Sequence, residues 1–186
     1  MSKNIERYDR QIRAWGFETQ KKLESASILI IGSGIVAEEC MKNLVLAGCG
    51  SIIVVSYLEH DEKLEYIRSL NPNTNIIVLS GHYNTSDIVS KFCITVIGCF
   101  DTFSCDNMAS RSTIVLWSSD NVIYLSNSRE LIRSEPYECN DPLISLICGA
   151  MASQMIIDYL PPSDSDVDLK LEMDMSTLAS RVVRLQ

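Results

Sequence analysis

Ser27-Ile28-Leu29-Ile30-Ile31-Gly32-Ser33-Gly34-Ile35-Val36-Ala37 is the stretch that decides the fold. Its apolar first part predicts a strand that is buried on both faces of a parallel sheet. The glycine turn that follows leads into an amphipathic helix, expected over 35–47. A second apolar run at 51–55 completes a strand, turn, helix and strand, which is the βαβ unit of a doubly wound α/β fold.

The rest of the chain continues this alternation of strands and helices. The first segment, 5–26, predicts one helix or two short helices with a break near Gly16. Further helices are expected at 59–70, 102–111 and 142–160, and further strands at 75–79, 94–98, 113–117 and 122–125, the last of them at a sheet edge. We therefore expect a Rossmann-like, doubly wound, mostly parallel sheet over 1–160. An acidic linker and a tail, weakly helical at 176–185, are expected over 161–186.

Composition and charge argue against several classes of function. A chain of 186 residues with 46% hydrophobic and 22% charged residues is typical of one soluble globular domain. The net charge of -8 argues against nucleic acid or an anionic membrane as the main partner. The longest apolar runs, such as 28–31 and 52–55, are too short to span a bilayer. We expect no secretory signal at the start of the chain.

The seven cysteines raise the question of a disulfide framework or a zinc site. Most of them lie inside apolar runs, their number is odd, and no CxxC pair is present. Only His60 and His82 add imidazole groups. We therefore expect buried thiols in a reducing compartment and no metal site. The cysteines are Cys40, Cys49, Cys93, Cys99, Cys105, Cys139 and Cys148.

The glycine turn also fits the GxGxxG/A pattern of nucleotide-binding turns. In such turns the glycines let the backbone approach a phosphate, and the helix amides favour negative charge. A nicotinamide-binding domain needs an acidic residue at the end of the second strand to hold the ribose hydroxyls, and Ser56 occupies that place. The nearest acidic residue, Glu59, comes several positions late. We therefore expect Gly32 and Gly34 to serve the turn and close helix packing, with no cofactor bound by this chain.

Four stretches of the sequence resemble the ubiquitin-like-protein activating enzymes, within the ThiF–MoeB family. The opening string, Arg7-Tyr8-Asp9-Arg10-Gln11-Ile12-Arg13-Ala14-Trp15-Gly16, is the most specific of them, because folding alone does not demand such a string. The opening match continues over 18–23, and the others are 27–50 with its NLVLAG, LNPN at 70–73 and 147–154. Within the family the smaller subunits of SUMO-activating enzymes are most similar, and the regulatory subunits of NEDD8-activating enzymes come second.

The resemblance implies an adenylation domain, and the departures from the family pattern imply that it is a reduced, inactive one. Active subunits carry an Asp for the ATP ribose where this chain has Ser56, and their phosphate-binding stretch is missing between 57 and 65. Asp101 matches the family's magnesium-binding Asp, or else caps a solvated helix. One carboxylate without a ribose anchor or phosphate-binding cations cannot organise MgATP. We therefore expect Gly32, Gly34, Ser56 and Asp101 to form a degenerate site and the partner subunit to bind MgATP.

The resemblance assigns one functional side chain to this protein, Arg10, which in the family crosses into the partner's nucleotide site. The implied partners are the larger catalytic subunit and a ubiquitin-like protein, with SUMO first, in the nucleus or the cytoplasm. Tyr8 and Trp15 are expected to pack inward while the guanidinium of Arg10 points out of the domain. The alternative is a surface ion pair between Arg10 and Asp9.

Two other functions stay open. A homodimeric adenylating protein of the bacterial sulfur-carrier type shares the opening string, and it would catalyse carrier-dependent ATP–pyrophosphate exchange by itself. A small NAD(P)-dependent or nucleotide-sensing Rossmann protein would bind nucleotides directly. Ser56 argues against both, since it leaves the ribose without an anchor.

Overall fold

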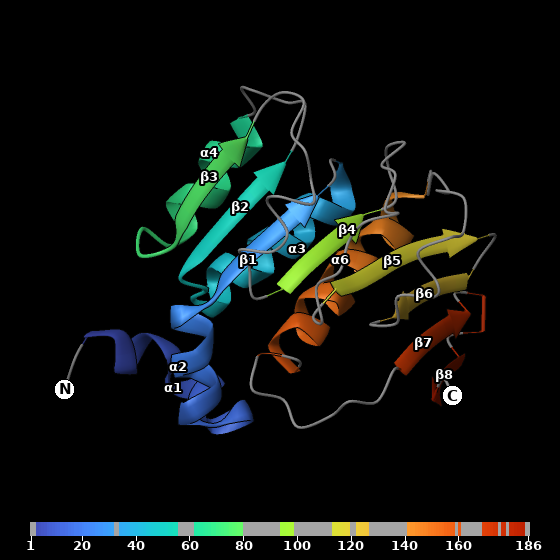
Figure 1. The fold of residues 1–186 in the computed structure, drawn as a ribbon, viewed down its shortest axis with the longest axis horizontal. Helices are drawn as coiled ribbons and strands as arrows, with labels where there is room; N and C mark the ends of the chain where they lie inside the picture. The colour runs from blue at the N-terminus through green and yellow to red at the C-terminus, as the bar shows by residue number, and fades with distance from the viewer. Residues whose placement is uncertain are drawn as a thin grey trace.

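The sheet has eight strands within the described residues, in the order β3-β2-β1-β4-β5-β6-β7-β8, as a computed structural model shows (Figure 1). The structure describes residues 3–31, 34–55, 62–79, 94–98, 113–119, 122–126, 141–158, 160, 169–174, 176–177 and 179–184. The strands are β1 (Ser27–Ile31), β2 (Ser51–Val55), β3 (Asn75–Leu79), β4 (Ile94–Gly98), β5 (Thr113–Ser119), β6 (Val122–Ser126), β7 (Leu169–Asp174) and β8 (Ala179–Arg184). The helices are α1 (Lys3–Trp15), α2 (Phe17–Ser25), α3 (Ile35–Ala47), α4 (Glu62–Leu70) and α6 (Pro142–Asp158).

The first five strands form the parallel half of the sheet and confirm the expected doubly wound fold. β1 pairs in parallel with β2 on one side and with β4 on the other, so Ile30 lies between Val54 and Val96. β3 pairs with β2, and β5 pairs with β4, again in parallel. The strand order therefore reverses between β1 and β4, which is the switch point where ligands bind in folds of this type.

The last three strands are antiparallel, and two expectations are wrong here. β6 is not an edge strand, because it pairs with β5 on one side and β7 on the other. The segment predicted as weakly helical contains β8, which pairs with β7 so that Met173 lies opposite Ser180. Asp174 stabilises the turn between them, since its carboxylate accepts hydrogen bonds from Ser176 and from the Thr177 amide. These hydrogen bonds lower the pKa of Asp174. The sheet thus continues beyond residue 160.

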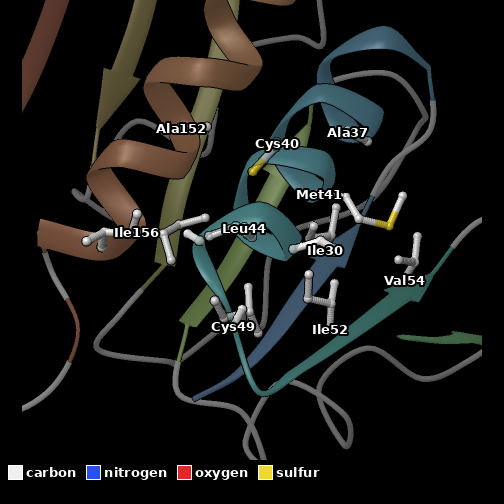
Figure 2. Close-up of a cluster of buried hydrophobic side chains, with 14 of the residues drawn as sticks. Ile30, Ala37, Cys40, Met41, Leu44, Cys49, Ile52, Val54, Ala152 and Ile156 are labelled. Atoms are coloured by element: carbon white, nitrogen blue, oxygen red, sulfur yellow. The ribbon is translucent and has the colours of Figure 1, made fainter. Parts of the chain in front are cut away.

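Helices α3, α4 and α6 lie on one face of the sheet (Figure 1). Figure 2 shows α3 beside α6, with Cys40 and Leu44 directed into the apolar cluster that Ile30, Ile52 and Ile156 also line. The residues of β1 that alternate with this cluster are buried as well. Burial on both faces is what the continuous apolar run of β1 predicted.

Most predicted helix bounds are confirmed to within a few residues. α1 and α2 are separate helices, broken at Gly16, and α3 ends at Gly48 in the left-handed conformation with φ +89°. The predicted helix at 102–111 and the acidic linker at 161–168 lie outside the described residues. Among the helices that are described, none is long and apolar enough to cross a membrane.

Candidate functional site

The glycine turn ends at Gly34, which is the described part of the predicted degenerate site. Gly34 is the residue before α3, has φ +87°, and accepts a hydrogen bond from the Glu38 amide at 3.0 Å. This backbone conformation favours glycine whether or not a phosphate binds nearby. Gly32, Ser56 and Asp101 lie outside the described residues, so their roles stay predictions.

A carboxylate lies in the first turn of α3, where a phosphate-binding helix offers positive charge. Glu38 belongs to that first turn and binds the Lys63 ammonium of α4, with both carboxylate oxygens at 3.0–3.1 Å. An acidic side chain at a helix N-terminus interacts favourably with the helix dipole. The helix end is thus partly neutralised by the protein's own carboxylate, which favours a packing role for the turn.

The opposite end of α3 is where the N-terminal helices dock. The last four carbonyl groups of a helix have no partner within the helix and need one from elsewhere. Gln11 donates to the Leu46 carbonyl at 3.3 Å, and Gln20 donates to the Ala47 carbonyl at 3.0 Å. Arg7 does the same for the end of α4, donating to the Leu70 carbonyl at 2.6 Å. Side chains of α1 and α2 therefore cap the carboxyl ends of both α3 and α4.

Two buried polar side chains complete this docking. Asn71 donates to the Tyr8 hydroxyl at 2.7 Å and to the Val45 carbonyl at 2.9 Å. Gln20 accepts a hydrogen bond from the Trp15 indole at 3.2 Å. Three of the stretches that carry the family resemblance, the opening string, NLVLAG and LNPN, thus meet at one place. The expectation that folding does not demand the opening string is wrong for several of its residues, because they cap and anchor helices.

Arg10 is different from its neighbours in the opening string. Its side chain is exposed, and within the described residues its guanidinium has no hydrogen-bond or ion-pair partner. Asp9 pairs instead with Arg13, one helical turn on, at 2.9 Å. The alternative of an Asp9–Arg10 ion pair is therefore wrong. Tyr8 is buried as predicted, and Trp15 is half-buried against the apolar cluster.

Arg10 lies far from this chain's own glycine turn. α1 contacts the carboxyl end of α3, whereas Gly34 precedes its amino end (Figure 1). α3 has 13 residues, so the two ends are about 20 Å apart at the usual helical rise. An arginine side chain is much shorter than this distance. Any nucleotide that Arg10 contacts is therefore bound elsewhere than at the turn of the same chain.

The outer face of α6 is a second feature, which carries exposed apolar side chains with no partner among the described residues. Its inner face packs so closely on α3 that a Cβ added to Gly149 would lie 2.6 Å from the Val36 carbonyl oxygen. On the outside, Leu143 and Leu146 are 62% and 43% exposed. The only charged residue of this helix is Asp158, its last. The exposed apolar residues Leu143, Leu146 and Ala150 form what we name the α6 face, whereas Ile147, Met151 and Met155 are partly buried against the apolar cluster.

The described cysteines are buried thiols, as expected. Cys40, Cys49 and Cys148 are all buried, and none is in a disulfide. Burial raises the pKa of the Cys40 thiol to about 12, with smaller contributions from Cys49 and Glu39. Among the described residues, no three His, Cys, Asp or Glu side chains come together as metal ligands would.

Comparison with known families identifies the first part of the chain. Residues 8–57 match the ThiF family. This segment of the chain is therefore similar to the ThiF family. The matched residues include α2, α3, β1 and β2 and most of α1, so the ThiF segment holds both Arg10 and Gly34.

Three curated relatives of the ThiF segment are named as subunits of SUMO- or NEDD8-activating enzymes. SUMO-activating enzyme subunit 1A of Arabidopsis thaliana is 48% identical over 67 residues, 36% of this chain and 19% of that protein. SUMO-activating enzyme subunit 1 of Xenopus tropicalis is 28% identical over 148 residues, 76% of this chain and 40% of that protein. A NEDD8-activating enzyme E1 regulatory subunit of Arabidopsis thaliana is 53% identical over 49 residues, 26% of this chain and 9% of that protein. The chain therefore spans less than half the length of these relatives.

The likeness extends to the fold of solved structures. The structure of PaaA matches with a TM-score of 0.77 and covers 99% of this chain and 74% of that chain. The sequence identity is only 13%, so this likeness concerns the fold alone. It agrees with the Rossmann-like α/β sheet described above.

Proposed function

We propose that this protein is the non-catalytic subunit of a heterodimeric ubiquitin-like-protein activating enzyme, with SUMO as the modifier. The observation that carries the proposal is the position of Arg10. Its guanidinium is exposed and unpaired within the described residues, and α1 contacts the end of α3 that lies a helix length of about 20 Å from the glycine turn. A side chain so placed suits a nucleotide that another subunit binds.

The proposed chemistry is the formation of an acyl adenylate. The C-terminal carboxylate of the modifier attacks the α-phosphate of ATP, the bond to the β-phosphate breaks, and pyrophosphate leaves. A cysteine thiol of the larger subunit then captures the adenylate and releases AMP. Arg10 contributes donors to phosphate oxygens as negative charge redistributes during the first step. Arginine suits this role because it stays charged and presents a planar fork of N–H groups.

MgATP belongs to the larger subunit in this proposal. In this chain Ser56 follows β2 where a ribose-binding acid is needed, and Glu38 occupies the first turn of α3. The Lys63 ammonium that lies nearby binds Glu38. These residues favour a turn that is retained for packing. We therefore expect the chain alone to bind ATP more weakly than about 1 mM, where the binding free energy is only about -4 kcal/mol.

The α6 face is the surface that we assign to the larger subunit. Contiguous exposed apolar surface on a soluble domain marks interaction sites. The face is uncharged along its length, as the centres of permanent interfaces are. A helix of 17 residues is about 25 Å long, so it supplies only part of the roughly 2,000 Å² that obligate interfaces bury. Changing Leu143 to Asp should weaken the complex and leave the domain folded, because Leu143 is largely exposed.

Reconstitution tests this function. The chain is expressed alone, with a SUMO-specific larger subunit, and with a NEDD8-specific one, and each sample is assayed for modifier-dependent ATP–pyrophosphate exchange. We expect exchange only with a larger subunit present, a 1:1 complex by light scattering, and no heat of ATP binding by the chain alone. Exchange by the chain alone with a sulfur-carrier protein would instead establish a homodimeric adenylating enzyme. Micromolar nucleotide binding without exchange would establish a nucleotide-binding module.

A further inference from the structure

Arg10 lies between two anchored points of α1. Two positions before it, the Tyr8 hydroxyl is held by the Asn71 amide. Five positions after it, the Trp15 indole donates to Gln20. A helix that is fixed at two points along its length can neither slide nor rotate. The Cα of Arg10 is thus held in place, while its side chain alone remains unpaired within the described residues.

The anchor at Tyr8 is rigid for a physical reason. Asn71 is completely buried, and its amide nitrogen donates both to Tyr8 and to the Val45 carbonyl at the end of α3. Its side-chain oxygen accepts from the Asn73 amide at 3.3 Å. Moving the Tyr8 hydroxyl would leave a buried donor of Asn71 unpaired, and such a loss opposes any shift of α1.

Gly48 allows the ring of the same tyrosine to pack closely against the end of α3. A Cβ on Gly48 would lie 2.5 Å from Cζ and 2.6 Å from the hydroxyl oxygen of Tyr8. The ring therefore rests directly on the backbone that ends α3. The Arg7 guanidinium adds a contact at 6.0 Å from the centre of the same ring. Packing therefore holds the Tyr8 ring in place, and the hydrogen bond of its hydroxyl to Asn71 restricts the remaining movement of α1.

We propose that Tyr8 with Asn71, and Trp15 with Gln20, are positioning residues that aim Arg10 at the partner's nucleotide; this inference rests on the proposed function. Groups that stabilise a transition state must be placed to within about 0.5 Å. A displacement of about 1 Å far from the reacting atoms can slow a reaction roughly a hundredfold. The polar anchors of α1 therefore affect the adenylation rate through Arg10 and not only through folding.

The test is a double-mutant cycle in the reconstituted complex. Tyr8→Phe removes only the hydroxyl and leaves the ring on Gly48. We expect it to lower kcat for ATP–pyrophosphate exchange roughly three- to tenfold, well short of that hundredfold bound, with the KM for ATP nearly unchanged and the complex intact. In an Arg10→Ala background the same change should have little further effect. Ser69→Ala is the matched control, since it removes an exposed hydroxyl near Asn71 that bonds only to the Tyr66 carbonyl.

Each outcome of the cycle decides between the two proposals. If Tyr8→Phe lowers kcat by the same factor in both backgrounds, the hydroxyl acts through stability alone. The positioning role is then overturned, while the role of Arg10 stands. No loss from Tyr8→Phe in either background also overturns it. No loss from Arg10→Ala itself overturns the trans arginine, and the positioning role with it. Trp15→Phe, in the same cycle, gives an independent reading from the second anchor in case Tyr8→Phe folds poorly.

Discussion

Replacing Gly149 by Ala tests the close approach of α6 to α3. The added Cβ would lie 2.6 Å from the Val36 carbonyl oxygen, 2.7 Å from Glu39 Cβ and 3.0 Å from the Cys40 amide nitrogen. Two of these atoms belong to the backbone, so they cannot rotate away and the helices must separate. Overpacking of this kind costs about 1–3 kcal/mol. We take the upper end of that range because backbone atoms are involved.

Helix propensity acts in the opposite direction and makes the sign of the result informative. Ala is favoured over Gly inside a helix by about 1 kcal/mol. The expected net loss for Gly149→Ala is therefore about 2 kcal/mol of unfolding free energy, which lowers Tm by about 2–4 °C per kcal/mol. Ala150→Gly, at the adjacent exposed position, measures the propensity effect alone. Chemical denaturation of both variants gives the comparison, and a more stable Gly149→Ala would refute the close packing of α3 and α6.

Three further changes should alter stability in defined directions. Gly34→Ala should lose about 1–3 kcal/mol of unfolding free energy in denaturant titrations, because φ +87° with ψ -172° is a conformation that essentially only glycine adopts, although no atom would contact the new Cβ. Gln20→Met should lose about 2 kcal/mol or more by the same measurement, since it leaves the Ala47 carbonyl and the Trp15 indole unpaired. Burial raises the pKa of Cys40 from the ordinary value of 9.0 to about 12, so the folded state favours the neutral thiol. The contribution of this thiol to folding stability is therefore fully present below pH 9 and is lost as pH rises towards 12. The stability difference between wild type and Cys40→Ala should therefore narrow across that range, and a constant difference would contradict the raised pKa.

The parallel half of the fold could be predicted because its signals are local. The apolar run of β1, the glycine turn and the left-handed Gly48 mark the bounds of β1 and α3 in the sequence itself. The antiparallel half was harder, because its strands are stabilised by pairing with distant segments. β7 did carry a signal, since Leu169, Leu171 and Met173 alternate with charged residues. β8 has no such alternation, and its pairing with β7 decides its conformation.

The contacts at the site also include local ones, which the sequence indicates, and long-range ones, which it does not. The Asp9–Arg13 pair follows from their i,i+4 spacing on one helix and leaves Arg10 unpaired within the described residues. The contacts of Tyr8 with Gly48 and Asn71 could not be predicted, because these residues lie at helix ends that are 40 and 63 positions away in the sequence, respectively. Capping of helix carbonyls by distant polar side chains leaves no periodic pattern in a sequence.

The most direct test of the account is the ATP–pyrophosphate exchange rate of the reconstituted complex with Arg10→Ala. We predict an intact complex and an exchange rate roughly ten- to a thousandfold lower than that of the wild type, which corresponds to about 1.4–4 kcal/mol of barrier. Arg13→Ala, on the same helix but paired with Asp9, should change the rate far less. Equal exchange rates for the wild-type and Arg10→Ala complexes would contradict the central claim that this chain completes its partner's adenylation site.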